Sequence, residues 1–291
     1  MIERVAIVGT GLIGASVGLA LKAHGFAGIV VGWDANADEL STALRIGAVD
    51  QALSKHDVYD PDVADVFVLA TPVLAILDWM QPLAAGLHES QFVTDVGSTK
   101  NDIATMAARL FNRPGRARFL PGHPMAGKES GGAALAEATL FAGATWLFTP
   151  LVEQFQPHSE ALDLEAEWRA LVAGFGAQVR DLGPERHDAV CAWVSHLPQM
   201  VSTAMSAMLV DEFVGDAEGM AAVQAIGGRA LREMTRLGSS PYSMWRDVAM
   251  TNTENVAATL WALEQRLAYV RENLRTPELR AEFLKANTFR K

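Results

Sequence analysis

One histidine of this chain has the setting of an acid–base catalyst. His123 lies in the segment Gly122-His123-Pro124-Met125-Ala126-Gly127, in a loop expected directly after a short strand at Arg118-Phe119-Leu120. The unperturbed pKa of histidine is about 6.5, so a neutral ring accepts a proton at physiological pH. The same pattern also suits a structural histidine that holds its loop by hydrogen bonds.

A second group of residues has the spacing of a dinucleotide-binding loop. Gly9-x-Gly11-x-x-Gly14 follows the apolar run 5–8, typical of a strand buried on both faces, and a helical pattern runs from Leu12 to His24. The glycines permit a tight turn, close approach of a pyrophosphate and close packing of helix on strand. The helix start adds free N–H groups and a positive dipole end. The expected cofactor-binding residues are Gly9, Thr10, Gly11, Leu12, Ile13 and Gly14.

Asp34 follows the predicted strand Ile29–Trp33 and lies 20 residues beyond Gly14. A carboxylate there accepts both ribose hydroxyls of NAD and repels the additional phosphate of NADP. Neither Lys nor Arg occurs between Val30 and Leu44, so no basic site for that phosphate is evident nearby. Asp34 also suits a simpler role as the cap of the next helix. We expect NAD as the cofactor rather than NADP.

The elements that must position these residues alternate between apolar runs and helical patterns. This alternation predicts an α/β fold with a doubly wound parallel sheet of the Rossmann type. The further predicted strands are 64–70, 91–96, 118–120, 145–149 and 178–182, and the predicted helices are 38–45, 73–87, 162–175 and one that ends at residue 110.

Two of the strand ends carry polar candidates. Thr71 and Pro72 follow the strand 64–70 and are expected along the dinucleotide, because carboxyl ends of such strands face the cofactor. Pro72 equally suits the first turn of a helix. Ser98 or Thr99 is expected to cap the helix that ends at residue 110, and the hydroxyl of Ser98 alternatively serves the site.

The pattern changes after Gly183, beyond which no strand-like run occurs. We therefore predict a dinucleotide-binding domain over residues 1–183 and a helical domain over 184–291. Apolar residues recur every three or four positions from Val190 to Met208, and this face has to be covered. A homodimer through the C-terminal helices is expected. The predicted helices are 185–213, 217–226, 229–236, 242–274 with breaks, and 277–285.

Several motifs, in order along nearly the whole chain, closely resemble the prephenate/arogenate dehydrogenase family. They are GTGLIG, DVGSTK, GHPMAGKESGG, HDAVCAWVSHLP, MTRLGSSPYSMWRD and TNTENV. The resemblance implies a Rossmann domain followed by a helical dimerisation domain. It also implies oxidation of prephenate to 4-hydroxyphenylpyruvate, or of arogenate to tyrosine, with loss of carbon dioxide in tyrosine biosynthesis.

The resemblance assigns roles to individual residues. His123 is implied as the catalytic base that takes the proton of the substrate's ring hydroxyl. Arg236 is implied as the arginine that binds a substrate carboxylate, although its position also suits a surface arginine at a helix end. The other implied site residues are Ser98 near the ring hydroxyl, His196 in the substrate pocket, Glu129 as a gating acid, and Trp245, approaching the site or packing in the dimer.

Lys128 stands where many relatives of this family carry an uncharged residue. It adds a cation near an anionic substrate, and its effect on substrate choice or inhibition is open. No metal site is expected, because His187 and His196 are nine positions apart and are not neighbours on one helical face.

The composition restricts the class of protein. The chain has 291 residues, a net charge of −10 and one cysteine. The negative charge argues against nucleic acid or an anionic membrane as the main partner, so an anionic substrate needs local cations. The single cysteine forms no internal disulfide, and Met1 to Arg4 leave no room for a signal peptide before the first strand, so we expect a cytoplasmic protein.

Three functions remain open on the sequence. The first is an NAD-dependent prephenate dehydrogenase. The second is the same scaffold acting on arogenate or on both substrates, which an acidic residue facing the substrate's amino group would favour. The third is a non-catalytic, NAD-sensing dimer, although sensing a cofactor needs neither His123 nor Arg236. Whether tyrosine inhibits the protein is open.

Overall fold

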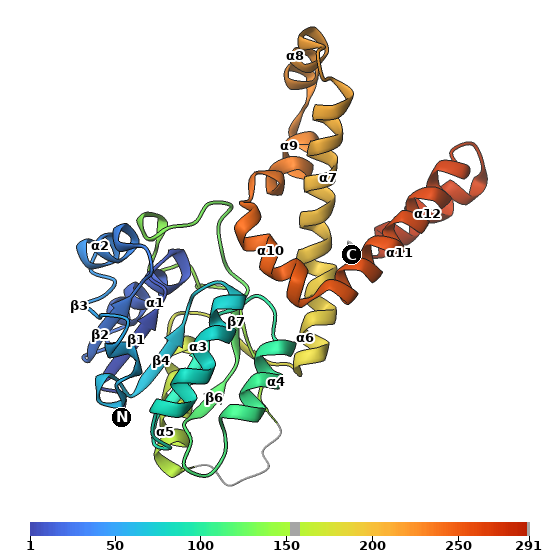
Figure 1. The fold of residues 1–291 in the computed structure, drawn as a ribbon. Coiled ribbons are helices and arrows are strands. Elements are labelled where there is room, and N and C mark those ends of the chain that lie inside the picture. Colours follow the sequence, from blue (N-terminus) through green and yellow to red (C-terminus); the bar gives the residue numbers. More distant parts are fainter. Residues whose placement is uncertain (152–157, 290–291) are drawn as a thin grey trace.

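A parallel sheet carries the first part of the chain in the computed structural model, which describes residues 1–151 and 158–289 (Figure 1). Its six strands lie in the order β3-β2-β1-β4-β5-β6, and every neighbouring pair is parallel. This order reverses direction between β1 and β4, as in doubly wound dinucleotide folds. The strands are β1 (Arg4–Val8), β2 (Ile29–Trp33), β3 (Gln51–Ala52), β4 (Val66–Leu69), β5 (Phe92–Asp95) and β6 (Arg118–Leu120).

Helices cover both faces of this sheet, because alternate residues of each strand point to opposite sides. Val5 and Ile7 of β1 pack into one core with α1 and α5, and Ala6 and Val8 pack into a second core with α3 and α4. The predicted doubly wound sheet is therefore confirmed. The helices are α1 (Leu12–Ala23), α2 (Ala37–Arg45), α3 (Val73–Gly86), α4 (Asn101–Leu110) and α5 (Ser159–Gly174), and short 3₁₀ turns are η1 (Asp57–Tyr59), η2 (Pro61–Val63) and η3 (Ala133–Leu135).

A second, three-stranded sheet carries His123. Strand β7 (Gly122–Pro124) pairs antiparallel with β8 (Thr145–Phe148), which pairs parallel with β9 (Gln178–Asp181). The sequence predicts β8 and β9, but its placement of His123 in a loop is wrong. A three-residue strand is too short to show an alternating pattern, and its partner lies farther along the chain. As a strand residue opposite Leu147, His123 is held by main-chain pairing.

Among the described residues after β9 there is no strand, and the helices extend from the α/β part as two arms (Figure 1). The predicted domain boundary at residue 183 falls between β9 and α6. One long helix is predicted over 185–213, but a π-helical segment interrupts it. The elements are α6 (Pro184–Cys191), η4 (Ala192–His196), α7 (Leu197–Glu212), α8 (Ala217–Ile226), α9 (Arg229–Thr235), η5 (Arg236–Ser239), α10 (Tyr242–Thr251), α11 (Thr253–Glu272) and α12 (Pro277–Phe289).

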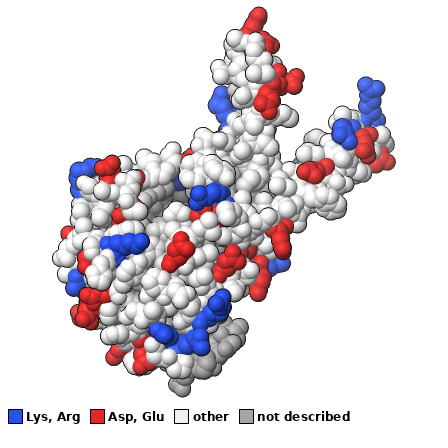
Figure 2. Space-filling view, in the orientation of Figure 1, with Lys and Arg blue, Asp and Glu red and all other residues white. Residues whose placement is uncertain are grey.

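The arms expose large apolar side chains, and Figure 2 shows much uncharged surface along both of them. Such exposure is unusual for a surface in contact with water alone. None of the helices in the described ranges is long and apolar enough to cross a lipid bilayer. The most exposed of these side chains include Met208, Val214, Ile226, Trp261, Leu267 and Phe283.

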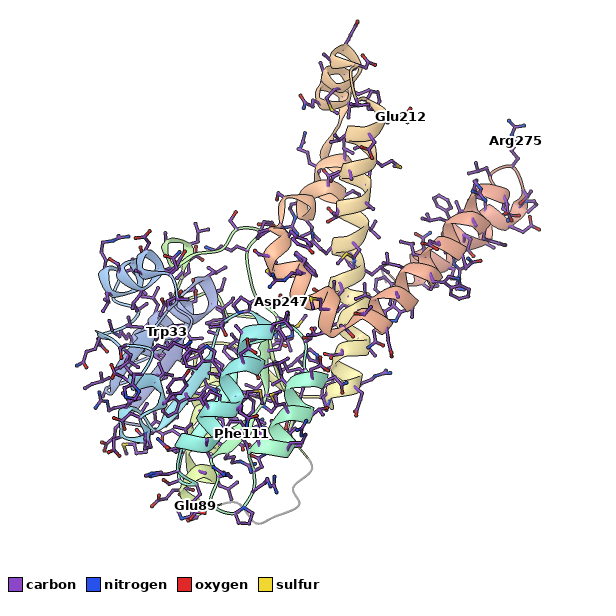
Figure 3. All side chains as sticks on the ribbon, in the orientation of Figure 1. Trp33, Glu89, Phe111, Glu212, Asp247 and Arg275 are labelled. Carbon is purple, nitrogen blue, oxygen red and sulfur yellow. The ribbon has the colours of Figure 1, made fainter. Side chains whose placement is uncertain are left out.

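The two parts of the chain meet where α10 contacts α3. Asp247 of α10 (labelled in Figure 3) lies at this junction, and its Oδ2 accepts the main-chain N–H of Leu74 at 3.2 Å. Asp247 is 1% exposed, and its other oxygen accepts two hydrogen bonds from the guanidinium of Arg246. The junction is therefore held by polar contacts as well as by packing.

The packing of α1 predicts a measurable loss of stability for Gly18→Ala. A Cβ at Gly18 would lie 2.1 Å from the carbonyl oxygen of Ala48, so α1 has to move away. We expect the free energy of unfolding in urea to fall by about 1–3 kcal/mol. Gly174→Ala, at the end of α5 with no atom within 4 Å of the new Cβ, is the matched control and should not lose stability. Equal unfolding midpoints for the two variants would contradict the close approach of α1 to the main chain of Ala48.

Candidate active site

A cavity of about 390 Å³ lies at the carboxyl ends of β1, β4 and β5, next to β7 and the start of α10. This is the place where doubly wound sheets bind ligands. Residues of both parts of the chain line it, because Pro241, Ser243 and Met244 come from the helical part. The predicted site residues among its lining are Gly11, Leu12, Ile13, Thr71, Pro72, Ser98, His123, Lys128 and Glu129.

The glycine loop leaves room for a ligand at one position only. A Cβ at Gly9, whose φ is +99°, would lie 2.6 Å from the main chain of Ala70, and a Cβ at Gly14 would lie 1.9 Å from the oxygen of Gly9. These two glycines are needed for the turn and for close packing. A Cβ at Gly11 meets no atom within 4 Å, and Gly11 lines the cavity and starts α1 without a side-chain cap. The main chain there is open to an anionic group.

Asp34 contacts the glycine loop and does not cap the next helix. Its Oδ2 accepts the N–H of Thr10 at 2.6 Å, and its Oδ1 accepts the N–H of Asn36 at 2.8 Å. The side chain of Asn36, and not that of Asp34, caps α2 by accepting the N–H of Asp38. Asp34 and Thr10 lie outside the lining of the cavity, and their role toward a cofactor stays a prediction.

Two further side chains hold the ring of His123. Its Nδ1 lies 2.9 Å from Nε2 of His187, and Nδ1 of His187 lies 2.8 Å from Oδ1 of Asp188. His187 is completely buried, Asp188 is 1% exposed and His123 is 9% exposed. Burial, together with the positive charge that His187, Lys100 and His196 can carry, lowers the pKa of His123 well below its ordinary value. His123 is therefore neutral at physiological pH and able to accept a proton.

The expected cap of α4 by Ser98 or Thr99 is wrong. Asp188, from α6, accepts the N–H of Lys100 at 2.7 Å with Oδ1 and the N–H of Asn101 at 2.9 Å with Oδ2. The hydroxyl of Thr99 instead bonds to the hydroxyl of Thr251 at 2.7 Å. Ser98 lines the cavity. A cap supplied from another element is invisible in the local sequence, because the sequence pattern shows only the residues next to the helix start.

A buried ion pair lies beside the cap. The ammonium of Lys100 bonds to Oδ2 of Asp95, and both side chains are fully buried. Asp95 also accepts the N–H groups of Gly97 and Gly122, so it joins the end of β5 to the start of β7. Burial raises the pKa of Asp95 and lowers that of Lys100, and the opposite charge of the partner opposes each shift. Loss of either partner would leave a buried charge alone, which is strongly destabilising.

Arg236 comes to the edge of the cavity through an ion pair. Its guanidinium bonds to the carboxylate of Glu129, which lines the cavity. The side chains are 60% and 37% exposed, so solvent screens the pair. Lys128 donates to the carbonyl of Leu135 at 2.8 Å and to Glu137 at 2.6 Å. Two ion pairs, Arg236 with Glu129 and Lys128 with Glu137, thus lie at the edge of the cavity.

His196 and Trp245 pack behind the cavity rather than along its described lining. Their rings stand edge to face, with centroids 6.0 Å apart, and Nδ1 of His196 lies 3.2 Å from Nδ2 of Asn252. His196 is 1% exposed, and Nε1 of Trp245 is buried without a hydrogen-bond partner. Their assignment as substrate-binding residues stays a prediction.

Family models match both parts of the chain. The model described as "Prephenate dehydrogenase, nucleotide-binding domain" matches residues 17–174, and the model described as "Prephenate dehydrogenase, dimerization domain" matches residues 183–286. The chain belongs to the prephenate dehydrogenase family.

Individual members of this family are similar over most of the chain. Prephenate dehydrogenase of Bacillus subtilis is 31% identical over 257 residues, which are 88% of this chain but 66% of that relative. The chain thus spans slightly less than two thirds of this curated relative.

Solved structures of the family agree closely with the fold. Prephenate dehydrogenase from A. aeolicus, in complex with hydroxyphenyl propionate and NAD⁺, has a TM-score of 0.85 and 29% identity, with 100% of this chain and 97% of that chain covered. Synechocystis arogenate dehydrogenase has a TM-score of 0.75 and 27% identity, with 99% and 98% covered.

In this family member, sequence reasoning missed the residues behind His123. His187 and Asp188 stand in the motif HDAVCAWVSHLP, and the dipeptide His-Asp was the available signal. The sequence relates His187 only to His196, nine positions away. No local pattern indicates that His187 lies next to His123. Ser130, Gly131, Pro241, Ser243 and Met244 also line the cavity without having been predicted.

The fold also brings three possible metal ligands together in the described part of the chain. Donor atoms of His123, His187 and Cys191 lie within 4.8 Å of one another. The expectation of no metal site considers only the spacing of His187 and His196. His196 is not a member of this group. Burial raises the pKa of the Cys191 thiol to about 12, whereas a metal binds the thiolate. Hydrogen bonds already join the three side chains.

The buried His196 predicts an acid-sensitive fold. Burial lowers its pKa from 6.5 to about 4, with Asp188 opposing and His187 adding to the shift. Between these two values the unfolded chain binds a proton that the folded chain does not, so the free energy of unfolding falls as pH falls. The loss attributable to His196 is about 2–3 kcal/mol between pH 7 and roughly 4.5.

Urea unfolding at these two pH values measures this loss. His196→Asn should lose less stability than the original chain on acidification. His88→Gln, which changes an exposed histidine, is the control and should lose as much as the original chain. An equal loss in His196→Asn and His88→Gln would contradict the assignment.

Proposed function

We propose that this chain catalyses the NAD-dependent oxidative decarboxylation of prephenate to 4-hydroxyphenylpyruvate. The observation that carries the proposal is the neutral, buried ring of His123 at the wall of a cavity that the glycine loop also lines. Membership in the family and the relatives named above supply the substrate class. In this mechanism the α/β part holds the cofactor and both parts enclose the substrate.

The glycine loop and Asp34 fit a dinucleotide. The pyrophosphate would meet the open main chain at Gly11 and the start of α1, and the carboxylate of Asp34 would accept the ribose hydroxyls. When bound, NAD supplies the acceptor for a hydride. The relative from A. aeolicus was solved with NAD⁺, which supports the same cofactor here.

His123 would act as the base. It accepts the proton of the ring hydroxyl while the carbon that bears this hydroxyl loses a hydride. The C–O bond becomes a carbonyl, the ring carboxylate leaves as carbon dioxide, and its bonding electrons complete the aromatic ring. The carbonyl oxygen regains a proton as the phenol forms. Ser98, which lines the same cavity, is proposed to orient the hydroxyl. A positioned base of this kind contributes roughly 10²–10⁴ in rate.

Local cations would bind the anionic substrate despite the net charge of −10. Arg236 offers a planar pair of donors for a carboxylate, and Lys128 stands at the same edge of the cavity. Glu129 competes with the substrate for Arg236, because it already pairs with this guanidinium. We propose that substrate entry exchanges the carboxylate of Glu129 for that of the substrate.

A homodimer completes the proposal. The C-terminal part matches the family's dimerization domain, and its arms expose large apolar side chains that a second copy would cover. Trp245 is proposed to act at or near the site, although dimer packing explains it equally. A monomeric mass by light scattering would contradict the dimer.

Activity on arogenate, alone or together with prephenate, is the alternative that the similarity to Synechocystis arogenate dehydrogenase favours. Initial rates with prephenate and arogenate, each with NAD and NADP, test the proposal. We expect the highest kcat/KM with prephenate and NAD. A preference for arogenate would support the alternative, comparable values with NADP would remove the role of Asp34, and no turnover at all would favour an NAD-sensing protein.

The role of His123 predicts the effect of His123→Asn. The variant keeps a polar side chain of similar reach but no basic nitrogen, so kcat should fall by roughly 10²–10⁴-fold. The dissociation constant for NAD, measured by quenching of protein fluorescence, should stay unchanged. Near-normal turnover would remove His123 from this role.

The exchange at Arg236 predicts opposite effects for two changes that each remove one charge of the ion pair. Arg236→Gln should raise the KM for prephenate by about tenfold or more, which corresponds to about 1.4 kcal/mol of lost binding. Glu129→Gln frees the guanidinium and should lower KM. Steady-state kinetics at constant ionic strength measure both, and a change in the same direction would contradict competition for Arg236.

A further inference from the structure

Three buried side chains form a continuous hydrogen-bonded chain that ends at the cavity. Asp188 contacts Nδ1 of His187 at 2.8 Å, and Nε2 of His187 contacts Nδ1 of His123 at 2.9 Å. Of these three, His123 lines the cavity, and His187 and Asp188 lie behind it. The ring of His123 thus uses Nδ1 toward the protein, and Nε2 is the nitrogen that a ligand in the cavity can reach.

The direction of each hydrogen bond follows from the carboxylate of Asp188, which can only accept. The carboxylate of Asp188 already accepts two main-chain N–H groups at the start of α4, so it is an acceptor for His187 as well. Nδ1 of His187 is therefore the donor. In a neutral ring the other nitrogen then carries no proton and accepts a hydrogen bond. Nε2 of His187 therefore accepts, and Nδ1 of His123 has to carry the proton that it donates to this nitrogen.

We propose that His187 and Asp188 are positioning residues that hold His123 in the Nδ1–H tautomer and leave Nε2 as the base facing the cavity. This inference rests on the proposed function, because it concerns His123 as the catalytic base. The opposite arrangement, a doubly protonated His187 donating to His123, would place the proton of His123 on Nε2 and abolish its basicity toward a ligand.

Charged and titratable groups from several elements surround His187. The ammonium of Lys100 is buried in the same cluster, where it pairs with Asp95. The charged and titratable groups that face His187 are Asp188 on its own helix, Lys100 at the start of α4, Cys191 one turn further along α6, His123 on β7 and His196 in η4.

Asp188 is also fixed from the side of α11. Its main-chain carbonyl accepts a hydrogen bond from Nδ2 of Asn252 at 2.9 Å. The side chain of Asn252 also contacts His196. The acceptor for His187 is thus held by α4 from one direction and by the turn before α11 from the other. Such a supporting contact is what keeps a catalytic ring in one orientation.

The tautomer of His123 can be measured without any activity. In protein labelled with ¹⁵N-histidine, two-bond ¹H–¹⁵N correlations distinguish a ring protonated at Nδ1 from one protonated at Nε2, and loss of one ring system in His123→Asn assigns the signals. We expect His123 to be protonated at Nδ1 in the original protein. A ring protonated at Nε2, with a doubly protonated His187, would overturn the inference.

Variants of His187 separate positioning from packing. His187→Leu fills the space but accepts no hydrogen bond, so the tautomer preference should be lost and kcat should fall by at least about tenfold with an unchanged dissociation constant for NAD. His187→Gln places an amide oxygen near the former Nε2 and should restore the Nδ1–H tautomer and a large part of kcat. Cys191→Ala, which removes a sulfur 3.6 Å from Nε2 of His187, is the control and should keep the tautomer.

The outcomes distinguish this inference from the proposed function. Equal kcat in His187→Leu and His187→Gln would contradict positioning while leaving the dehydrogenase activity intact. No turnover of prephenate or arogenate by the original protein would contradict the proposed function, whatever tautomer is found, and full activity of His123→Asn would remove His123 as the base.

Discussion

The arrangement of the site depends on the hydrogen bonds that the buried carboxylate of Asp188 accepts. It caps α4 of the dinucleotide-binding part while it belongs to α6 of the helical part, and it holds the histidine behind His123. Because Asp188 is buried, its charge is tolerated only while these donors are present. Separation of the two parts of the chain at this point would therefore expose the carboxylate of Asp188 or leave it without hydrogen-bond donors. The ring of His123, the proposed base, is thus held by a contact that also joins the two parts of the chain.

The outer side of the cavity is built in the opposite way. Arg236 and Glu129 form an ion pair that is largely exposed, and such pairs contribute little to stability. A weak, solvent-screened pair can open for a carboxylate of the substrate at small cost, whereas a buried pair such as Lys100 with Asp95 cannot. Rigid placement of the proposed base and an adjustable contact for an anion suit the proposed reaction, in which an acid has to bind and a product has to leave.

The sequence predicts the features of this fold that a local pattern encodes. It does not predict the features that depend on contacts between residues far apart in the chain. The apolar run 5–8, the glycine spacing and the helix after it are contiguous, so β1 and α1 are predicted almost to the residue. The strand of His123 is too short for a pattern, and the cap of α4 comes from Asp188, 88 residues away from Lys100. Arg236 was placed at the substrate by resemblance alone, and its contact with Glu129 comes from tertiary structure.

The pH dependence of kcat/KM for prephenate tests most directly whether the neutral, buried His123 is the base. This parameter reports the ionisation of the free enzyme's essential groups. Burial and the neighbouring cations lower the pKa of His123 well below 6.5, so kcat/KM should stay constant as pH falls through 6.5 and decline only at more acidic pH. An acidic limb with its midpoint at 6.5 or above would show that the group accepting the proton is not the buried His123.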